Sequence, residues 1–479
     1  MHLGSCLELQ SGSTKHCVPV LAAAPAMEGV CSSLRYALSD AHRPIETPLM
    51  RILHLSPSYY PDAGGAETYL QQVSERLAQR GHEITVFVTH APISSRFPAG
   101  NHLNLARSEV INRVAVKRFE PEGHFLRWLN TLLRQRGSYR FLRMFMPPEK
   151  IEMLSGGPLN LGTIAAALRY KADILTVTNW SFTSIVYQGY LIKRLTNVPL
   201  LGIPLLHTEE EWSRSALRAE MLAKCDVILA LTDHEKRFIE PRVPRYCGVH
   251  VVGAGVDPQS FSDRDGAQVR RRYGIGDAPV VGYVGRMQPT KGVVTTIEAM
   301  KSVWALDSRV RLLLAGRHFP RGTQQDQEFE QALAGLSPDE RARVIHVDGF
   351  DDKEKPSIFD AMDVFAMPST AESFGIAYLE AWMCRKPVIG SRIGSTQCVV
   401  EDGVDGVLVD PNDPREIAAV ISELLADRKR AQRMGQQGYE KTLSRFTWDK
   451  ITDKVERIFL NLIATSDQGR QSPSAPSPR

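Results

Sequence analysis

Residues 280–300 read VVGYVGRMQPTKGVVTTIEAM, an uncharged apolar run followed by a glycine, a short loop and an amphipathic pattern. The run is rich in valine, which is typical of a strand buried on both faces of a parallel sheet. Ten more such runs alternate with helix patterns, which predicts parallel sheets covered by helices on both faces. They are residues 51–56, 83–89, 172–178, 199–207, 225–231, 310–316, 344–349, 363–368, 386–391 and 406–410.

The alternation restarts after the loop at residues 251–261. We therefore predict two doubly wound, Rossmann-like α/β domains of similar size facing a cleft, because open sheets of this kind bind ligands at the carboxyl ends of their strands. The Ser/Pro-rich ending and the start without periodicity both predict disorder. The predicted parts are an extension at 1–49, an N-terminal domain at 50–250, a C-terminal domain at 251–442 and a tail at 464–479.

The composition is that of a globular protein, with 479 residues, 43% hydrophobic residues and a net charge of +4. No apolar run approaches the roughly 18 residues that a membrane span needs. The seven cysteines are scattered and lack C-x-x-C spacing, which argues against a disulfide framework or a zinc site. Residues 17–27 have the small residues of a cleavage region, but they are short and contain two prolines. A cytoplasmic location is the prediction.

Two loops that follow predicted strands suit an anion. In PSYYPDAGGAETYL (57–70), Gly64 and Gly65 precede a helix, so backbone N–H groups and the helix dipole can face a phosphate. A tight turn is the alternative, and neither the dinucleotide G-x-G-x-x-G pattern nor the P-loop lysine pattern is present. In the second loop, Arg286 and Lys291 suit a diphosphate, with solvated surface charges as the alternative.

The stretch ESFGIAYLE (372–380) follows another predicted strand. Thr370 or Ser373 is expected to cap its helix, while Glu372 precedes the helix and Glu380 lies in its early turns. One carboxylate can then reach a ligand's sugar and the other its ribose. Two charges on a solvated helix, or the acid/base pair of a glycoside hydrolase, are the alternatives. The backbone N–H groups expected to face a pyrophosphate are those near Phe374, Gly375 and Ile376.

These segments, with VEDGVDGVLVDPND at 400–413, resemble the retaining glycosyltransferases of the GT-B fold, in the group that includes phosphatidylinositol mannosyltransferases and sucrose synthase-like enzymes. The resemblance runs from about Met50 to about Ile463. It implies a nucleotide-diphosphate sugar, UDP- or GDP-linked, on the C-terminal domain and an acceptor on the N-terminal one. It also implies retention of anomeric configuration, no cofactor, no dedicated metal, and a helix at 443–463 that crosses back to the N-terminal domain.

The same resemblance implies roles for individual residues. Arg286 and Lys291 would hold the diphosphate as leaving group, and Glu372 would contact the transferred sugar. Glu380 would bind the ribose, and His207 would lie near the sugar or the acceptor, although a histidine satisfied by the backbone is an alternative. The implied catalytic set is Arg286, Lys291, Glu372 and His207. The other implied donor-binding residues are Gly64, Gly65, Ser373, Phe374, Gly375, Ile376, Ala377 and Glu380. The implied acceptor-binding residues are Tyr60, Asp62, Glu67 and His207.

The chain departs from the pattern of these enzymes at two places. Asn179 stands where they usually carry a histidine, and residues 316–322 read GRHFPRG, which is basic and bulky for this loop. Both positions lie where sugar or nucleotide identity could be set. The Asp-x-Asp of Asp263 and Asp265 falls in a polar stretch and is interpreted as solvated surface charge.

The predicted function is transfer of a sugar to a glycan or lipid-linked acceptor, in the synthesis of cell-envelope polysaccharide or glycolipid. Two alternatives stay open. One is a nucleotide-sugar isomerase or hydrolase on the same scaffold, which would turn over donor without an acceptor. The other is an inactive nucleotide-sugar-binding protein, for which loss of Arg286, Lys291 or Glu372 would be expected, and all three are present.

A basic segment suggests where the acceptor is met. Residues 107–150 hold ten Lys and Arg against four Asp and Glu, and the part from Arg127 to Arg143 adds Phe, Trp, Leu and Met. This composition predicts peripheral contact with anionic lipid at the inner face of the membrane. A solvated helical face packed on its own domain is the alternative. Nucleic acid is not predicted as a partner, because no recognition module accompanies the segment.

Overall fold

A computed structural model gives the structure of the protein. Residues 49–479 form one compact unit, to which the following description applies. Most of the predicted N-terminal extension, Asp62, and the basic segment Arg127 to Arg143 lie outside the described residues. The structure describes residues 48–61, 64–89, 105–119, 160–180, 183–318 and 322–471.

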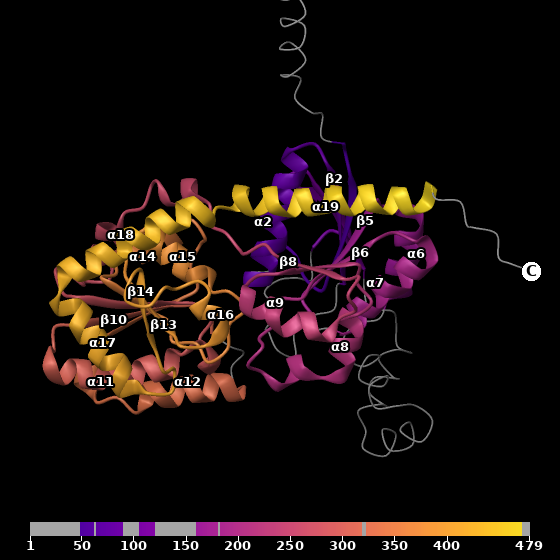
Figure 1. Cartoon of the computed structure of the whole chain (residues 1–479). Coiled ribbons are helices and arrows are strands. Elements are labelled where there is room, and N and C mark those ends of the chain that lie inside the picture. Colours follow the sequence, from indigo (N-terminus) through magenta and orange to yellow (C-terminus); the bar gives the residue numbers. More distant parts are fainter. Residues whose placement is uncertain are drawn as a thin grey trace, which may run out of the picture. The chain divides into compact units, whose positions relative to one another are not determined.

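The first domain is built on one sheet. Its strands are β1 (Arg51–Ser56), β2 (Glu83–Thr89), β3 (Ser108–Ile111), β4 (Val114–Phe119), β5 (Ile174–Thr178), β6 (Leu200–Ile203), β7 (Val227–Ala230) and β8 (Gly248–Val251). Its helices are α2 (Gly65–Gln79), α6 (Leu161–Tyr170), α7 (Thr183–Thr196), α8 (Ala216–Leu222) and α9 (Asp233–Ile239), with short 3-10 turns η3 (Glu211–Arg214) and η4 (Glu240–Arg242). The strand order is β3-β4-β2-β1-β5-β6-β7-β8, and in the described residues only the β3–β4 pair is antiparallel. Figure 1 labels β2, β5, β6 and β8 of this sheet.

The second domain has a fully parallel sheet. Its strands are β9 (Val280–Val284), β10 (Arg311–Gly316), β11 (Val344–Asp348), β12 (Val364–Ala366), β13 (Val388–Ser391) and β14 (Gly406–Val409). Its helices are η5 (Pro258–Phe261), α10 (Gly266–Arg272), η6 (Pro289–Lys291), α11 (Val293–Leu306), α12 (Gln324–Ala334), α13 (Pro338–Arg341), α14 (Lys355–Asp360), α15 (Ile376–Met383), α16 (Gly394–Gln397), α17 (Pro414–Ala426) and α18 (Arg428–Arg445).

Both sheets have a point at which the strand order reverses. In the second sheet, whose order is β11-β10-β9-β12-β13-β14, the chain runs outward from β9 in one direction and from β12 in the other. In the first sheet the same reversal falls between β1 and β5. Ligands of doubly wound sheets bind outside the carboxyl ends of the strands at such points. The predicted fold class is confirmed. The loops that follow β1 and β5 lie at the reversal point of the first sheet, and those that follow β9 and β12 lie at the reversal point of the second.

All eleven strands predicted from apolar runs are present, whereas β3, β4 and β8 were not predicted. β3 and β4 are joined by Asn112 and Arg113, both with positive φ, which is the backbone of a two-residue hairpin turn. Asn-Arg lacks the glycine that usually marks such a turn. The short β8 adds to the edge of the sheet beside β7.

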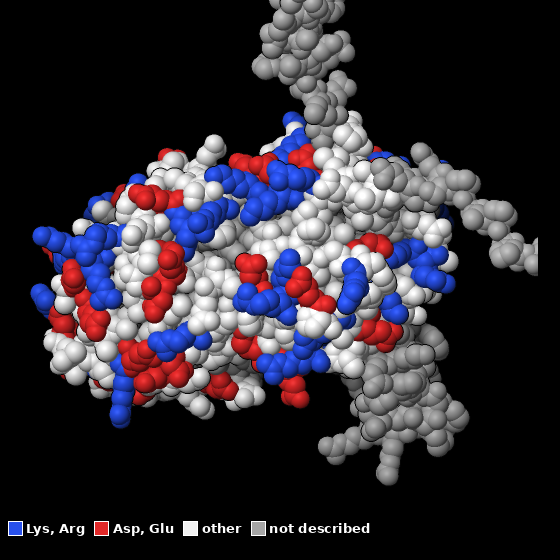
Figure 2. All heavy atoms as spheres, in the orientation of Figure 1, with Lys and Arg blue, Asp and Glu red and all other residues white. Residues whose placement is uncertain are grey.

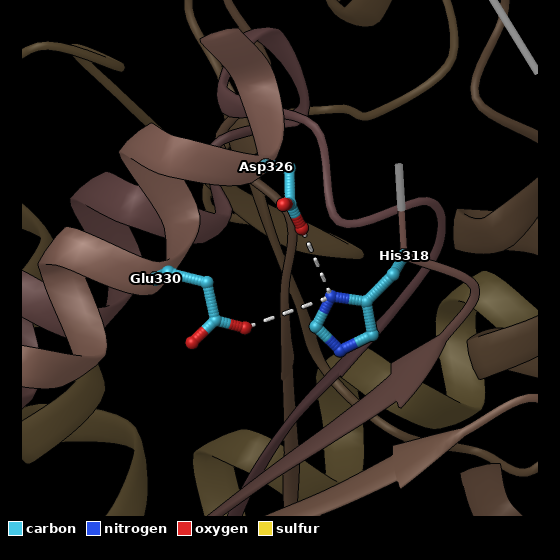
Figure 3. A group of neighbouring side chains, drawn as sticks. All are labelled: His318, Asp326 and Glu330. Carbon is cyan, nitrogen blue, oxygen red and sulfur yellow. Dashed lines mark ion pairs between the residues drawn. The ribbon is translucent and has the colours of Figure 1, made fainter. Parts of the chain in front are cut away.

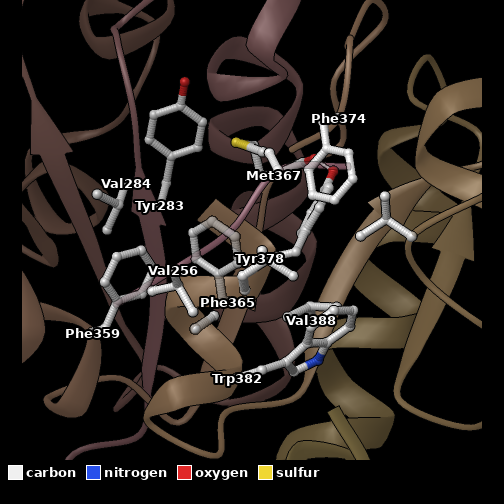
Figure 4. Close-up of a cluster of buried hydrophobic side chains, with 14 of the residues drawn as sticks. Val256, Tyr283, Val284, Phe359, Phe365, Met367, Phe374, Tyr378, Trp382 and Val388 are labelled. Carbon is white, nitrogen blue, oxygen red and sulfur yellow. Dashed lines mark hydrogen bonds between the residues drawn. The ribbon is translucent and has the colours of Figure 1, made fainter. Parts of the chain in front are cut away.

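Aromatic side chains fix α15 against β12 in the core of the second domain (Figure 4). The ring of Phe365 lies between those of Phe359 and Tyr378, with centroid distances of 5.3 and 6.1 Å. The Tyr378 hydroxyl donates to the Met367 carbonyl at 2.7 Å, and Trp382 is fully buried. The helix that carries part of the candidate site is therefore held rigidly by its own buried face.

A long helix, α19 (Trp448–Gln471), returns to the first domain and packs on α2. Arg76 forms an ion pair with Asp449 at 2.9 Å, and Arg80 forms one with Asp453 at 2.7 Å. The helix starts later than the predicted 443 and continues past 463, so residues 464–471 are helical and the expectation of a tail there was wrong.

None of the described helices combines the length and the apolar character needed to cross a bilayer. On the face that Figure 2 shows, basic and acidic side chains are interspersed.

Candidate functional site

The loop after β9 and the loop after β12 meet at the reversal point of the second sheet. Lys291 Nζ donates to Glu372 Oε2 at 2.8 Å and to the Ala371 carbonyl at 3.2 Å. Both side chains are nearly buried, with 12% and 10% exposed. The Thr370 N–H also donates to the Thr290 carbonyl at 2.9 Å. Two residues predicted to contact different parts of a ligand therefore form one buried ion pair.

The ionisation of Glu372 depends on its cationic neighbours. Burial favours its neutral form, but the charges of Lys291 and His207 and a hydrogen bond from the Ser373 N–H outweigh burial and hold its pKa below the usual range. Glu372 is therefore an anion at neutral pH. His207 belongs to the first domain, so the carboxyl ends of the two sheets are close enough to interact electrostatically.

Backbone hydrogen bonds fix the position of Arg286 in the β9 loop. Its carbonyl accepts from the buried Tyr283 hydroxyl at 2.6 Å and from the Gln288 N–H at 2.7 Å. The next residue, Met287, donates its N–H to the Arg317 carbonyl after β10 at 3.0 Å. The loop is thus held by hydrogen bonds to Tyr283 of its own strand, β9, and to Arg317, which follows β10.

The start of α15 differs from the prediction. Its N-cap is Gly375 with φ 91°, a conformation that favours glycine, and neither Thr370 nor Ser373 caps the helix. The Ser373 N–H is already used by Glu372 Oε1 at 3.1 Å. The backbone N–H groups of Phe374 to Ala377 have no acceptor among the described residues. These four donors at a helix N-terminus form a ready anion-binding surface.

The Phe374 side chain packs inside the protein. It is buried, and its ring packs edge-on against Phe446 with centroids 5.6 Å apart. Only the backbone of this residue is therefore available for a predicted contact.

Glu380 is held by a lysine that the sequence did not single out. Lys355 Nζ lies 2.9 Å from Glu380 Oε1, and this carboxylate is the main reason that the pKa of Lys355 is raised. Lys355 is the first residue of α14, and its side chain reaches across to α15. A lysine 25 positions away in sequence gives no local signal of this pairing.

The loop after β1 carries the predicted contacts of the first domain. Gly64 is the N-cap of α2 and Gly65 its first residue, as expected for an anion-binding turn. The carboxylate of Glu67 lies against Gly64 and accepts from the Ser58 hydroxyl at 2.5 Å, so Glu67 itself faces this helix N-terminus. Tyr60 is 48% exposed, and its carbonyl accepts from Arg118 at 3.0 Å. Asp62 lies outside the described residues.

His207 follows β6 and pairs with Glu210. Its Nδ1 lies 3.3 Å from Glu210 Oε1. This hydrogen bond is the main cause of a lowered pKa at Glu210, and the charge of Lys291 adds to the effect. His207, Glu210, Lys291 and Glu372 therefore form one electrostatic group drawn from both domains. Glu210 was not predicted, although its spacing of three residues from His207 could have suggested it.

The backbone that carries His207 is held by a buried carboxylate. Glu235, fully buried, accepts from the Leu206 N–H at 2.8 Å and from the Leu231 N–H at 2.7 Å. It thereby joins the loops after β6 and β7, one residue before His207. Burial raises its pKa to about 7 in spite of these two hydrogen bonds.

The raised pKa of Glu235 predicts how the stability of the protein depends on pH. The folded carboxyl keeps its proton to a higher pH than the unfolded one, whose pKa is about 4.3. The stability that the neutral form contributes is therefore lost as pH rises from about 4 through 7. In urea unfolding between pH 5 and 8, the free energy of unfolding of wild type should fall relative to Glu235→Gln. A difference that stays constant over this range would contradict the assignment.

The structure places Asn179 and the Asp-x-Asp of Asp263 and Asp265, which the sequence analysis singled out. Asn179 follows β5 at the reversal point of the first sheet, with φ 64° and its N–H donated to the Ile203 carbonyl at 3.2 Å. Asp263 is exposed, and Asp265, also exposed, caps α10 by accepting from the Gln268 N–H. The interpretation of the Asp-x-Asp as surface charge agrees with these positions, with helix capping as an added role.

Comparison with known proteins gives two family matches, one on each domain. Residues 63–260 match Glycosyltransferase Family 4, and residues 267–441 match Glycosyl transferases group 1. Among relatives, the D-inositol 3-phosphate glycosyltransferase of Geodermatophilus obscurus is 28% identical over 423 residues, covering 84% of this chain and 86% of that protein. The enzyme of the same name from Stackebrandtia nassauensis is 26% identical, covering 84% and 88%.

Solved structures share the fold. Sucrose-phosphate synthase from Thermosynechococcus elongatus has a TM-score of 0.69 at 22% identity, covering 87% of this chain and all of that one. Anabaena Alr3699/HepE, solved with UDP and glucose, has a TM-score of 0.66 at 20% identity, covering 86% and all of that chain. With two doubly wound sheets and a family match on each domain, the chain belongs to the group 1 glycosyltransferases of the GT-B fold.

Proposed function

We propose that the protein transfers a sugar from a nucleotide-diphosphate sugar to an acceptor hydroxyl with retention of anomeric configuration. The observation that carries the proposal is the Lys291–Glu372 pair together with the four N–H groups at the start of α15 that have no acceptor in the part of the chain that the structure describes. A cation and a helix N-terminus at one reversal point suit a diphosphate, and an anion at their edge suits a sugar.

In the proposed reaction the bond between the sugar's anomeric carbon and the diphosphate oxygen breaks, and a bond to the acceptor oxygen forms. Arg286, Lys291 and the α15 N–H groups would stabilise the negative charge that develops on the departing diphosphate. Retention requires the acceptor to approach the face that the diphosphate leaves. The acceptor proton would then pass to a departing phosphate oxygen, so that the leaving group is released as the nucleoside diphosphate.

The remaining residues would bind and orient. Glu372 would accept hydrogen bonds from sugar hydroxyls, and its ionised state suits that role. Glu380 would bind the ribose once a ligand competes with Lys355. His207 would orient the sugar or the acceptor, with its ring fixed by Glu210. The first domain would contribute contacts to the ligand from Tyr60, Asp62, Gly64, Gly65 and Glu67. The Glu67 carboxylate lies against Gly64, so it must move before a phosphate can contact Gly64.

A donor screen followed by a transfer assay tests the proposal. UDP-, GDP- and ADP-sugars should be compared by thermal shift, since a ligand of the native state raises the melting temperature. UDP-glucose is included because Anabaena Alr3699/HepE was solved with it, and D-inositol 3-phosphate is included among acceptors because relatives carry its name. NMR of the product should show the donor's anomeric configuration. An inverted product would refute retention, and donor turnover without acceptor would favour a hydrolase or isomerase.

We further propose a glycan or lipid-linked acceptor met at the inner face of the membrane, in envelope polysaccharide or glycolipid synthesis. The support is the composition of Arg127 to Arg143, which combines arginines with aromatic and aliphatic residues. The protein should co-sediment with anionic vesicles and not with neutral ones, and the bound fraction should fall as salt is raised. Recovery in the supernatant with both vesicle types would end the idea of membrane contact.

A further inference from the structure

A second polar cluster joins the loop after β10 to α12, and it contains neither Lys291 nor Glu372. His318 Nδ1 faces two carboxylates of α12 (Figure 3). It lies 3.7 Å from Asp326 Oδ1 and 3.9 Å from Glu330 Oε1, and one ligand atom from each of the three residues lies within 4.8 Å of the others. Nothing in the reaction proposed above uses these side chains.

Local sequence places the three groups together. Thr323 caps α12 by accepting from the Asp326 N–H, so the helix starts directly after the loop. Asp326 and Glu330 are four residues apart and project from one face of the helix. His318 comes two residues after the end of β10, and its ring packs edge-on against Phe329 and His346, with centroids 5.1 and 4.5 Å away. The direction of its Nδ1 is therefore fixed by packing.

The distances fit metal ligands better than hydrogen bonds. An N–H···O hydrogen bond joins heavy atoms about 2.7–3.2 Å apart, which is shorter than either separation. In a tetrahedral zinc site, nitrogen and oxygen ligands lie about 2.0–2.2 Å from the ion, which puts two ligand atoms about 3.4 Å apart. The two imidazole–carboxylate separations, 3.7 and 3.9 Å, exceed this by only a few tenths of an ångström.

The surroundings supply support of the kind that metal ligands have. The second oxygen of Asp326 accepts from the Gly322 N–H at 2.9 Å, which orients the first oxygen toward His318. Asp326 is 7% exposed, so its charge is buried. His346, whose ring touches that of His318, has a buried Nε2 with no hydrogen-bond partner among the described residues.

We propose that His318, Asp326 and Glu330 bind a divalent transition-metal ion, with Zn²⁺ as the best fit. An imidazole nitrogen among the ligands favours zinc over Mg²⁺ or Ca²⁺, which prefer oxygen alone. The site would fix the β10–α12 connection, one residue after the Arg317 carbonyl that supports the Arg286 loop. The ion is structural and takes no part in sugar transfer, so this inference stands apart from the proposed function.

Calorimetric titration of the metal-free full-length protein, without a polyhistidine tag, tests the site. ZnCl2, MnCl2 and MgCl2 are titrated into wild type, His318→Ala and Glu330→Gln. Glu330 is exposed, so its conservative variant should fold. Zinc should bind wild type, with Kd raised at least about tenfold in both variants. Glu328→Gln is the matched control on the same helix, because Glu328 pairs with Gln324 instead, and it should bind zinc like wild type.

Cysteines could bind zinc elsewhere, and Cys398 is exposed. Such sites would persist in His318→Ala, so only the binding step that the two variants remove is assigned to this cluster. A chelator should also lower the melting temperature of wild type and leave that of His318→Ala unchanged. The proposal is overturned if no zinc-binding step is lost in either variant, or if Glu328→Gln loses it equally.

Discussion

Replacing Arg286 or Lys291 by alanine is expected to lower kcat about 100-fold or more, the order found when a transition-state donor is removed. Negative charge develops on the diphosphate as the glycosidic bond breaks. The two cations should therefore stabilise the transition state more than the bound donor, and turnover should suffer more than affinity. Steady-state kinetics with the donor and acceptor found by the proposed screen give kcat and KM separately.

The two variants should differ in one respect. Lys291 neutralises the buried Glu372, so Lys291→Ala leaves that carboxylate with less positive charge around it and should raise its pKa. A carboxyl with a depressed folded pKa contributes stability that is lost as pH falls through that pKa. The difference in the free energy of unfolding between wild type and Lys291→Ala should therefore be largest near neutral pH, where Glu372 is charged, and should shrink as pH falls and Glu372 takes up a proton. The difference between wild type and Arg286→Ala should stay constant over the same pH range.

Glu380→Ala is the control for these kinetics. Its proposed partner is the ribose, which does not react, so the variant should raise KM for the donor and change kcat little. Circular dichroism should confirm that all three variants are folded. Near wild-type kcat at saturating donor in a folded Arg286→Ala or Lys291→Ala variant would refute the assignment.

Gly292→Ala should lower the free energy of unfolding by about 3 kcal/mol or more. Gly292 is the N-cap of α11 with φ 81°, which favours glycine. A Cβ there would lie 2.3 Å from the Pro368 carbonyl oxygen, which follows β12. Backbone atoms cannot rotate away as a side chain can, so the β9 and β12 loops would have to separate. Equilibrium urea unfolding measures the loss.

Gly274→Ala is the matched control for that substitution. Its φ of 63° is also positive, but a Cβ there would meet nothing within 4 Å. This substitution should lower the free energy of unfolding by about 1 kcal/mol, which is the conformational strain of a non-glycine residue at positive φ. Equal losses in the two variants would show that the close approach to Pro368 contributes nothing.

The apolar strands could be predicted because a parallel sheet buries both faces of each strand, which leaves a continuous hydrophobic run. β3 and β4 were missed because neither is a continuous apolar run. β3 alternates exposed and half-buried residues, every second residue of β4 is buried, and the turn between them, Asn112 and Arg113, contains no glycine. The order of loops after strands also predicted that Lys291 and Glu372 lie near one another, because parallel strands end at the same edge.

The pairings within the candidate site could not be predicted. Lys291 and Glu372 are 81 residues apart, and Lys355 and Glu380 are 25 apart, so each pair depends on how loops pack and not on local pattern. The cap of α15 was predicted wrongly because serine and threonine are common caps, whereas the left-handed backbone of Gly375 takes that position here. Glu235 gave no signal, because nothing in its local sequence reveals that it is buried.

The return of α19 to the first domain means that the two domains are not independent folding units. Trp448 packs edge-on against Tyr69 of α2 with centroids 5.8 Å apart, and the buried His82 lies 2.8 Å from Glu456. The first domain therefore obtains part of its core and a carboxylate partner for a buried imidazole from a segment that is synthesised after the second domain. A ribosome must finish the second domain before the first is complete, so cutting the gene between the sheets would leave the earlier product without its final layer.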